Sequence, residues 1–115
     1  MKLIAIAAGV MLMAAPLAAA DMASGAQIKA AVSGNTVQGG MTDGTAYTEF
    51  YDPDGTIKAV DYSADWSIDG DKMCFDYGEG GECWNVVIDG DTVTWMNDGV
   101  SEGTGTILPG NPNNF

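Results

Sequence analysis

The sequence predicts an all-β fold, a seven- or eight-stranded antiparallel meander that closes into a small barrel and carries a short N-terminal helix. Turn signals recur at short intervals, and the stretches between them are short and rich in Val, Ile, Thr and aromatic residues. Helical periodicity is confined to residues 24–32. The turn signals are Asp52-Pro53-Asp54-Gly55, Asp69-Gly70, Gly78-Glu79-Gly80-Gly81, Asp89-Gly90 and Asp98-Gly99.

Residues 1–20 have the organisation of a secretory signal peptide. Lys2 makes a positive start, residues 3–15 are apolar, and Pro16 is followed by small residues up to Ala20. A membrane anchor, the alternative, would need a longer apolar span than this Ala-rich, Pro-broken segment offers. We therefore expect a single domain over residues 21–115, without a membrane anchor after cleavage, and a periplasmic or secreted location.

Residues 24–32 are predicted to form the helix. Ser24 is a typical N-cap, Ile28 and Val32 share an apolar stripe with Ala31, and Gly34 stands near the expected stop. We expect Ile28 and Val32 to cover one open end of the barrel.

The hairpin turns predict the register of four consecutive strands. With turns at Asp69-Gly70, at Gly78-Glu79 and at Asp89-Gly90, Val86 faces Val93, and four large apolar side chains form one row across the strands. Because side chains alternate between the faces of a strand, Ile68, Val86, Ile88 and Val93 share the face of that row. This face is predicted to form the core, and the row supplies the residues that could contact a ligand: Trp66, Met73, Trp84 and Trp95.

Further strands are expected at residues 36–39, 46–51, 56–62 and 100–107. An open sheet of this length would leave two exposed edges, which closure into a barrel removes. The interior of an eight-stranded barrel is nearly filled by side chains or admits one small ligand, and the sequence leaves both possibilities open. Pro109 and Pro112 cannot continue a central strand, so the C-terminal tail is predicted to be a loop.

The same register predicts a disulfide between Cys74 and Cys83, which lie opposite each other on the face away from the tryptophan row. An exported chain meets oxidising conditions, and two cysteines allow one connectivity. A redox-active pair is the alternative, but the spacing is not C-x-x-C, and Asp76 and Glu82 oppose any lowering of a thiol pKa. We expect a structural bridge.

Several motifs together resemble those of small, uncharacterised exported bacterial proteins, of periplasmic location, with a compact calycin-like β-barrel. The resemblance implies the barrel fold and supplies no catalytic or binding residue. The motifs are Gly34-Asn35-Thr36, Tyr51-x-Pro53-Asp54-Gly55-Thr56, Trp66-x-Ile68-x-Gly70-Asp71 and Cys74-Phe75-x-Tyr77 followed by Cys83.

The composition excludes several classes of function. The chain of 115 residues has 16 Asp and Glu against 4 basic residues, a net charge of −12, and no His; every basic residue is a lysine. Such a chain lacks the cationic surface that nucleic acid requires. Without His or Arg it cannot build a Ser-His-Asp site, ligate zinc through imidazole or clamp an anion with guanidinium. We therefore expect neither an enzyme nor a cofactor.

The acidic residues allow two further interpretations. The Asp pairs at the turns contain the oxygen ligands that Ca²⁺ prefers, but no window matches an EF-hand, and Asp-Gly is what tight hairpins require. We interpret these residues as turn residues, with no metal. Four other acids could supply a glycosidase pair, but a barrel this small offers little cleft for a substrate: Asp61, Asp76, Glu79 and Glu82.

The leading hypothesis is an exported, non-catalytic binding or interaction module, whose partner is an unknown small ligand or a basic protein. The aromatic row supports a small ligand inside the barrel, although the same residues also fit a simply filled core. The acidic surface supports a second hypothesis, an inhibitor of a basic extracytoplasmic enzyme such as a lysozyme. An open apolar pocket would favour the first hypothesis, and a filled interior with a protruding acidic loop would favour the second.

Overall fold

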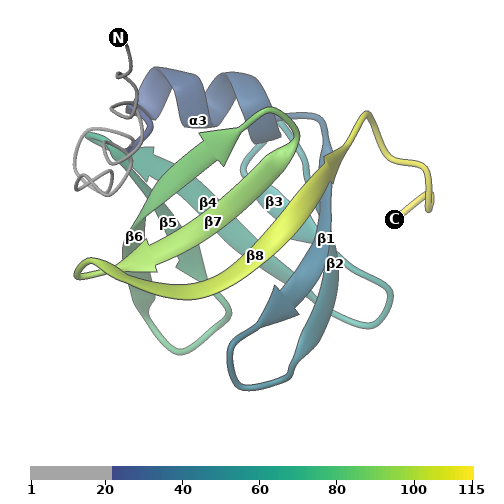
Figure 1. The fold of residues 1–115 in the computed structure, drawn as a ribbon. Coiled ribbons are helices and arrows are strands. Elements are labelled where there is room, and N and C mark those ends of the chain that lie inside the picture. The colour runs from purple at the N-terminus through teal and green to yellow at the C-terminus, as the bar shows by residue number, and fades with distance from the viewer. Residues whose placement is uncertain (1–21) are drawn as a thin grey trace, which may run out of the picture.

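The computed structural model describes residues 22–115, so the predicted signal peptide and Asp21 lie outside the described residues. This part of the chain forms eight antiparallel strands that close into a barrel in sequential order, with β8 paired back to β1 (Figure 1). The predicted all-β barrel with one short N-terminal helix is confirmed. The strands are β1 (Thr36–Met41), β2 (Ala46–Tyr51), β3 (Thr56–Lys58), β4 (Ser63–Asp69), β5 (Lys72–Asp76), β6 (Gly81–Asp89), β7 (Thr92–Asn97) and β8 (Val100–Leu108).

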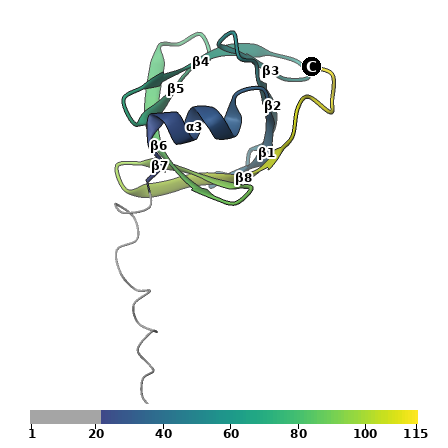
Figure 2. The same ribbon diagram turned by 90° about the horizontal axis from the view of Figure 1, so that it is seen from above.

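Helix α3 (Gly25–Val32) begins where the sequence predicts, because Ser24 caps it. The Ser24 hydroxyl accepts a hydrogen bond from the Gln27 amide at 3.1 Å, and the Gln27 side chain accepts one from the Ser24 amide at 2.8 Å. This reciprocal capping box satisfies two amides that the helix leaves without a partner. Ile28 and Val32 are fully buried, and α3 lies across one end of the barrel, as predicted (Figure 2).

The hairpin between β5 and β6 has the predicted register. Met73 pairs with Trp84 and Cys74 pairs with Cys83, with a four-residue turn between Asp76 and Gly81. The two cysteines form the predicted disulfide on the outer face of the barrel.

The predicted β4–β5 register is wrong by two residues along the partner strand. Asp69 pairs with Lys72, so the turn consists of Gly70 and Asp71, and Trp66 faces Phe75 rather than Met73. The β4–β5 turn has a positive φ of 62° at its first position, Gly70, and none at its second. This is the pattern of a type II′ turn, which takes Gly first, whereas the prediction placed Asp69 and Gly70 in the turn.

The predicted β6–β7 register is also wrong by two residues along the partner strand. Gly90 and Asp91 form the turn, so Trp95 faces Val86 rather than Trp84, and Val93 faces Ile88. Of the four residues predicted to form one row, only Met73 and Trp84 therefore lie directly opposite each other. A shift of two residues preserves the face, however, so all eight side chains assigned to the core face still point inward and lie in or against the core.

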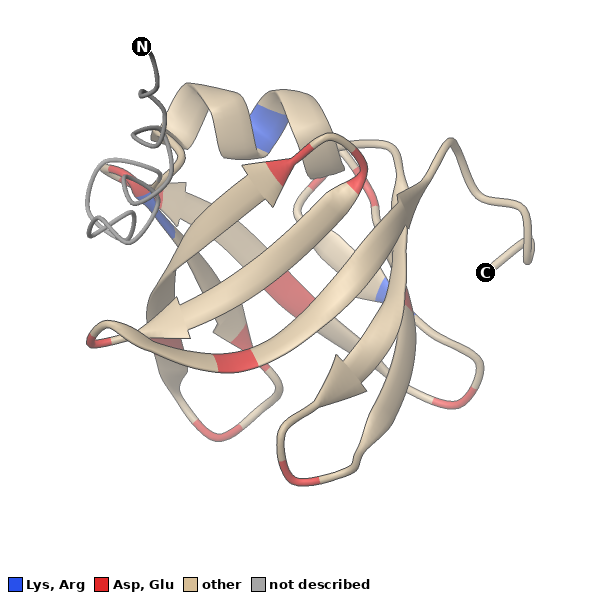
Figure 3. Ribbon diagram, in the orientation of Figure 1, with Lys and Arg blue, Asp and Glu red and all other residues tan. Residues whose placement is uncertain are grey.

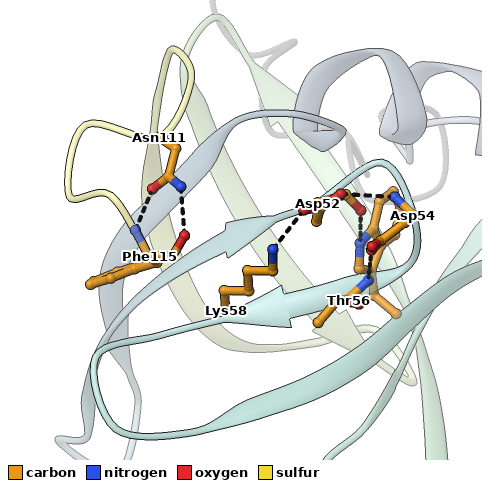
Figure 4. Close-up of polar contacts among 7 residues, drawn as sticks. Asp52, Asp54, Thr56, Lys58, Asn111 and Phe115 are labelled. Atoms are coloured by element: carbon orange, nitrogen blue, oxygen red, sulfur yellow. Dashed lines mark hydrogen bonds and ion pairs between the residues drawn. The ribbon is translucent and has the colours of Figure 1, made fainter.

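One further strand is shorter than predicted, and the C-terminal tail is as predicted. The strand predicted over residues 56–62 ends at Lys58, because the chain then turns into a loop before β4. The tail beyond Leu108 contains no strand, as predicted. It is held by Asn111, whose side chain bonds both the amide and the carbonyl of Phe115 (Figure 4).

Candidate ligand-binding site

The end of the barrel away from α3 opens into a cavity of about 490 Å³. The loops β1–β2, β3–β4 and β5–β6 contribute to its lining, together with inward-facing positions of five strands. Most of this lining is aromatic, and two carboxylates, Glu49 and Glu82, also face the cavity. The structure thus combines a filled core beneath α3 with an open, aromatic pocket at the opposite end.

Glycines on the inner face of β8 leave room for the side chains of the pocket. A Cβ on Gly105 would overlap the Tyr47 hydroxyl and the Val37 side chain, and a Cβ on Gly103 would overlap the sulfur of Met41. Close approach of this kind is a typical reason for glycine inside a strand. The absence of side chains at Gly103 and Gly105 therefore leaves the space that Met41 and Tyr47 occupy.

Glu49 lies on the inner face of β2 and is only 4% exposed. Its Oε1 accepts a hydrogen bond from the Tyr51 hydroxyl at 2.7 Å, and its Oε2 accepts one from Tyr62 at 2.6 Å. The Tyr77 hydroxyl bridges both oxygens, at 2.9 and 3.2 Å. Three phenol donors suit a carboxylate, which is an acceptor only, and supply the hydrogen bonds that a buried charge requires.

The three tyrosines reach Glu49 from separate segments. Tyr51 is two residues further along β2, Tyr62 ends the β3–β4 loop, and Tyr77 begins the β5–β6 loop. The carboxylate therefore joins one strand to two loops that are distant in sequence. We call these four residues the Glu49 cluster.

The surroundings keep these phenols protonated. Burial raises the pKa of Tyr51, Tyr62 and Tyr77 well above its ordinary value, and the neighbouring negative charge of Glu49 raises it further. Burial also raises the pKa of Tyr47 to about 12, although the hydrogen bond from Trp95 opposes this shift. All four side chains therefore act as neutral hydroxyl donors at neutral pH.

Aromatic side chains form the wall of the cavity and are held by polar contacts at their edges. The Trp95 indole N–H donates to the Tyr47 hydroxyl at 2.8 Å, and this hydroxyl donates to the Thr104 carbonyl at 2.9 Å. Phe75 meets Trp95 edge to face, with ring centroids 5.4 Å apart, and stacks on Tyr77. These contacts hold the aromatic side chains of the wall in place and leave ring surface facing the cavity.

Acidic residues surround the mouth of the cavity. Each of the four loops at this end carries one at or near its tip, and Figure 3 shows the red segments on these loops. Of the described lysines, Lys29 is on α3, Lys72 adjoins the β4–β5 turn at the far end, and Lys58 forms an ion pair with Asp52 at 3.0 Å. The loop acids are Asp43, Asp61, Glu79 and Asp98.

The predicted ligand-facing residues divide into two groups. Trp84 and Trp95 line the cavity. Trp66 and Met73 do not, because they lie deeper in the core; the Trp66 indole donates to the Asp52 carbonyl at 2.9 Å, and Met73 is fully buried.

Sequence reasoning missed the Glu49 cluster. One signal was present, since Tyr47, Glu49 and Tyr51 alternate along the predicted strand 46–51 and must share a face. A charged residue between two aromatic residues on one face marks an unusual inward position. Its contacts with Tyr62 and Tyr77 carry no signal in the sequence, because they depend on how two loops fold over the barrel mouth.

The Asp residues of the β2–β3 turn bond to the turn itself (Figure 4). An Asp52 carboxylate oxygen accepts from the Asp54 amide at 3.0 Å, and Asp54 accepts from the Thr56 amide at 2.9 Å. The hydrogen bond from the Asp54 amide and the neighbouring Lys58 ammonium lower the pKa of Asp52. The interpretation of Asp52 and Asp54 as turn residues is confirmed.

The four acids considered as a catalytic pair come from two loops and two strands. Asp61 and Glu79 lie on separate loops, and Asp76 accepts a hydrogen bond from the Gly78 amide at 2.8 Å. Glu82 alone of the four lines the cavity.

The Cys74–Cys83 bridge lies outside the cavity and is consistent with an oxidising, extracytoplasmic location. Within residues 22–115, no helix combines the length and the apolar character needed to cross a membrane. Comparisons with protein-family models, with curated proteins and with solved structures find no match to this chain.

Proposed function

We propose that this protein is an exported, non-catalytic binding module that holds one small, largely apolar ligand in the open end of its barrel. The observation that carries the proposal is the aromatic cavity opposite α3. Its volume of about 490 Å³ falls within the range of roughly 300–1,000 Å³ that is typical of small-molecule sites. An aromatic lining with few polar groups is also typical of such sites.

The hydrogen bonds that the Glu49 carboxylate accepts support binding rather than catalysis. A general base or nucleophile needs an oxygen free to meet the substrate. Both Glu49 oxygens already accept hydrogen bonds from neutral phenols. The chain also has no His or Arg to assist an acid–base or anion-stabilising step.

Export is supported by the signal-like residues 1–20 and by the disulfide. The motifs that resemble small periplasmic proteins with calycin-like barrels agree with this part of the proposal. Binding of a ligand outside the cytoplasm is the function that joins these features to the open cavity.

Tryptophan fluorescence tests the proposal, because Trp84 and Trp95 line the cavity and Trp66 does not. Titration with a neutral naphthalene probe is expected to quench or shift the emission to saturation. A Trp66→Phe variant should retain this response, and a Trp84→Phe variant should show a smaller one. No change in emission and no calorimetric heat at saturating probe would refute ligand binding in the barrel.

The acidic loops favour a second candidate, recognition of a basic protein, as an inhibitor of a basic extracytoplasmic enzyme such as a lysozyme would require. Lysozyme activity measured with excess protein at low and moderate salt tests this idea. Lysis that is undiminished at both salt concentrations would exclude it.

A further inference from the structure

We propose that the ligand of this cavity is an organic cation, an ammonium group that carries apolar or aromatic substituents. The inference rests on the binding function proposed above and names its ligand class. Three features of the described residues support it: the carboxylate at the Glu49 cluster, the ring surfaces of the wall and the acidic loops around the mouth.

The Glu49 cluster places a negative charge in the cavity, without a positive partner among the residues that the structure describes. Three tyrosine hydroxyls solvate the carboxylate, but neutral donors do not cancel its charge. Among residues 22–115, no lysine lines the cavity. A charge held in a poorly solvated site attracts an opposite charge more strongly than it would in water.

The wall of the cavity suits the substituents of such a cation. Because the Trp95 indole N–H and the Tyr47 hydroxyl are already bonded to protein partners, these side chains offer a ligand ring surface rather than further hydrogen bonds. Ring faces attract cations electrostatically, and tryptophan and tyrosine do so more strongly than phenylalanine. The sulfur of Met41 and the ring of Phe75 provide apolar contact in the same cavity.

The negative charges of the mouth and of Glu49 disfavour anionic and neutral ligands. An anionic ligand would pass four acidic loops and meet two carboxylates, Glu49 and Glu82, and no lysine of residues 22–115 lines the cavity to receive it. A neutral apolar ligand would leave the charge of Glu49 without an attractive partner in the cavity. A cation with apolar substituents would pair with the negative charge and would place its substituents against the aromatic wall.

Three probes of one shape test the proposal on the full mature protein: benzyltrimethylammonium, the neutral neopentylbenzene and the anionic phenylmethanesulfonate. Tryptophan fluorescence and calorimetry at one salt concentration give each Kd. We expect the cation to bind at least about tenfold more tightly than the neutral probe, and the anion to show no saturable binding.

A Glu49→Gln variant tests the role assigned to the carboxylate, because it keeps the shape and removes the charge. The preference for the cation over the neutral probe is expected to fall to about threefold or less, with the Kd of the neutral probe within about twofold of its original value. Asp91→Asn is the matched control. It removes one charge from an exposed turn at the opposite end of the barrel, so the full preference for the cation should remain.

Each outcome leads to a definite conclusion. If the neutral probe binds the unmodified protein as tightly as the cation, the ligand class is wrong while the binding function stands. If none of the three probes binds, and the naphthalene probe does not bind either, both proposals fail. A cation preference that persists in Glu49→Gln would overturn the assignment to Glu49. If that variant does not fold, the probe series on the unmodified protein still decides the ligand class.

Discussion

Glu49 shows how a single buried charge organises one end of this barrel. A carboxylate that is 4% exposed is costly unless hydrogen bonds replace its water. Here the replacement comes from tyrosines of two loops and of its own strand. The same contacts hold the two loops over the cavity, so at this position the stability of the fold and the shape of the site depend on one side chain.

Substitution Glu49→Ala is expected to lower the free energy of unfolding by about 1–3 kcal/mol, because the hydroxyl of the fully buried Tyr51 loses its acceptor. Urea denaturation measures this loss. The double variant Glu49→Ala with Tyr51→Phe removes the unsatisfied hydroxyl as well, so its loss should be smaller than the sum of the two single losses. Strict additivity would show that the hydrogen bond contributes nothing to stability.

The β5–β6 hairpin is the element whose register follows most directly from the sequence. Its turn lies between two cysteines that the alternation of strands places directly opposite each other. The disulfide closes a short loop on the outer face and leaves the inner face to Met73 and Trp84. Tyr77 and Glu82 lie near this covalent link, so it also limits the motion of one side of the cavity mouth.

Replacing both Cys74 and Cys83 by Ala is expected to lower the free energy of unfolding by about 2–3 kcal/mol, since the unfolded chain gains the freedom of the opened loop. Denaturant unfolding of the oxidised protein and of the double variant measures the difference. A reducing agent should lower the stability of the unmodified protein by a similar amount and leave the variant unchanged. Two free thiols in the native protein, detected by mass analysis, would contradict the structural bridge.

The whole molecule has two ends of opposite character. At one end α3 covers the core with Ile28 and Val32 (Figure 2). At the other end none of the described elements lies across the barrel, the wall is aromatic, and each of the four loops carries an acidic residue. Because consecutive antiparallel strands alternate in direction, four of the seven strand connections gather at the open end.

The tyrosines of the open end predict how stability depends on pH. Their pKa values in the folded protein lie above the ordinary value of 10.0, reaching about 12 for Tyr47. The unfolded chain therefore releases these protons at lower pH than the folded chain. Their contribution to stability is complete below about pH 10 and is lost as the pH rises through the folded values.

Urea denaturation at increasing pH checks this expectation. These tyrosines should leave the urea midpoint of unfolding unchanged through neutral pH. Above about pH 10 their titration should make the midpoint fall steeply. A Tyr62→Phe, Tyr77→Phe double variant should show a shallower fall, because two of the shifted groups are gone. A midpoint that does not change in the alkaline range would mean that the folded and unfolded tyrosines titrate alike.

Local chemistry determined most of the fold. Turn residues, alternation along the strands and the Ser24 cap act over a few neighbouring residues, so the sequence predicted the barrel, the helix, the disulfide and the inward faces of β4 to β7. Two registers were wrong because Asp-Gly and Gly-Asp both occur in the sequence at these turns, and both give tight hairpins. The error of two residues along the partner strand left the inner face unchanged.

The sequence by itself determined which residues of β4 to β7 face inward and that no site of this chain contains histidine or arginine. Only the tertiary structure decided that one end of the barrel is filled and the other is open, and that Tyr62 and Tyr77 meet Glu49 there. The physical reason is distance along the chain. Alternation and turn type are local properties, whereas a cavity and a buried hydrogen-bond cluster depend on how separate loops and the side-chain volumes of distant strands combine once the barrel has closed.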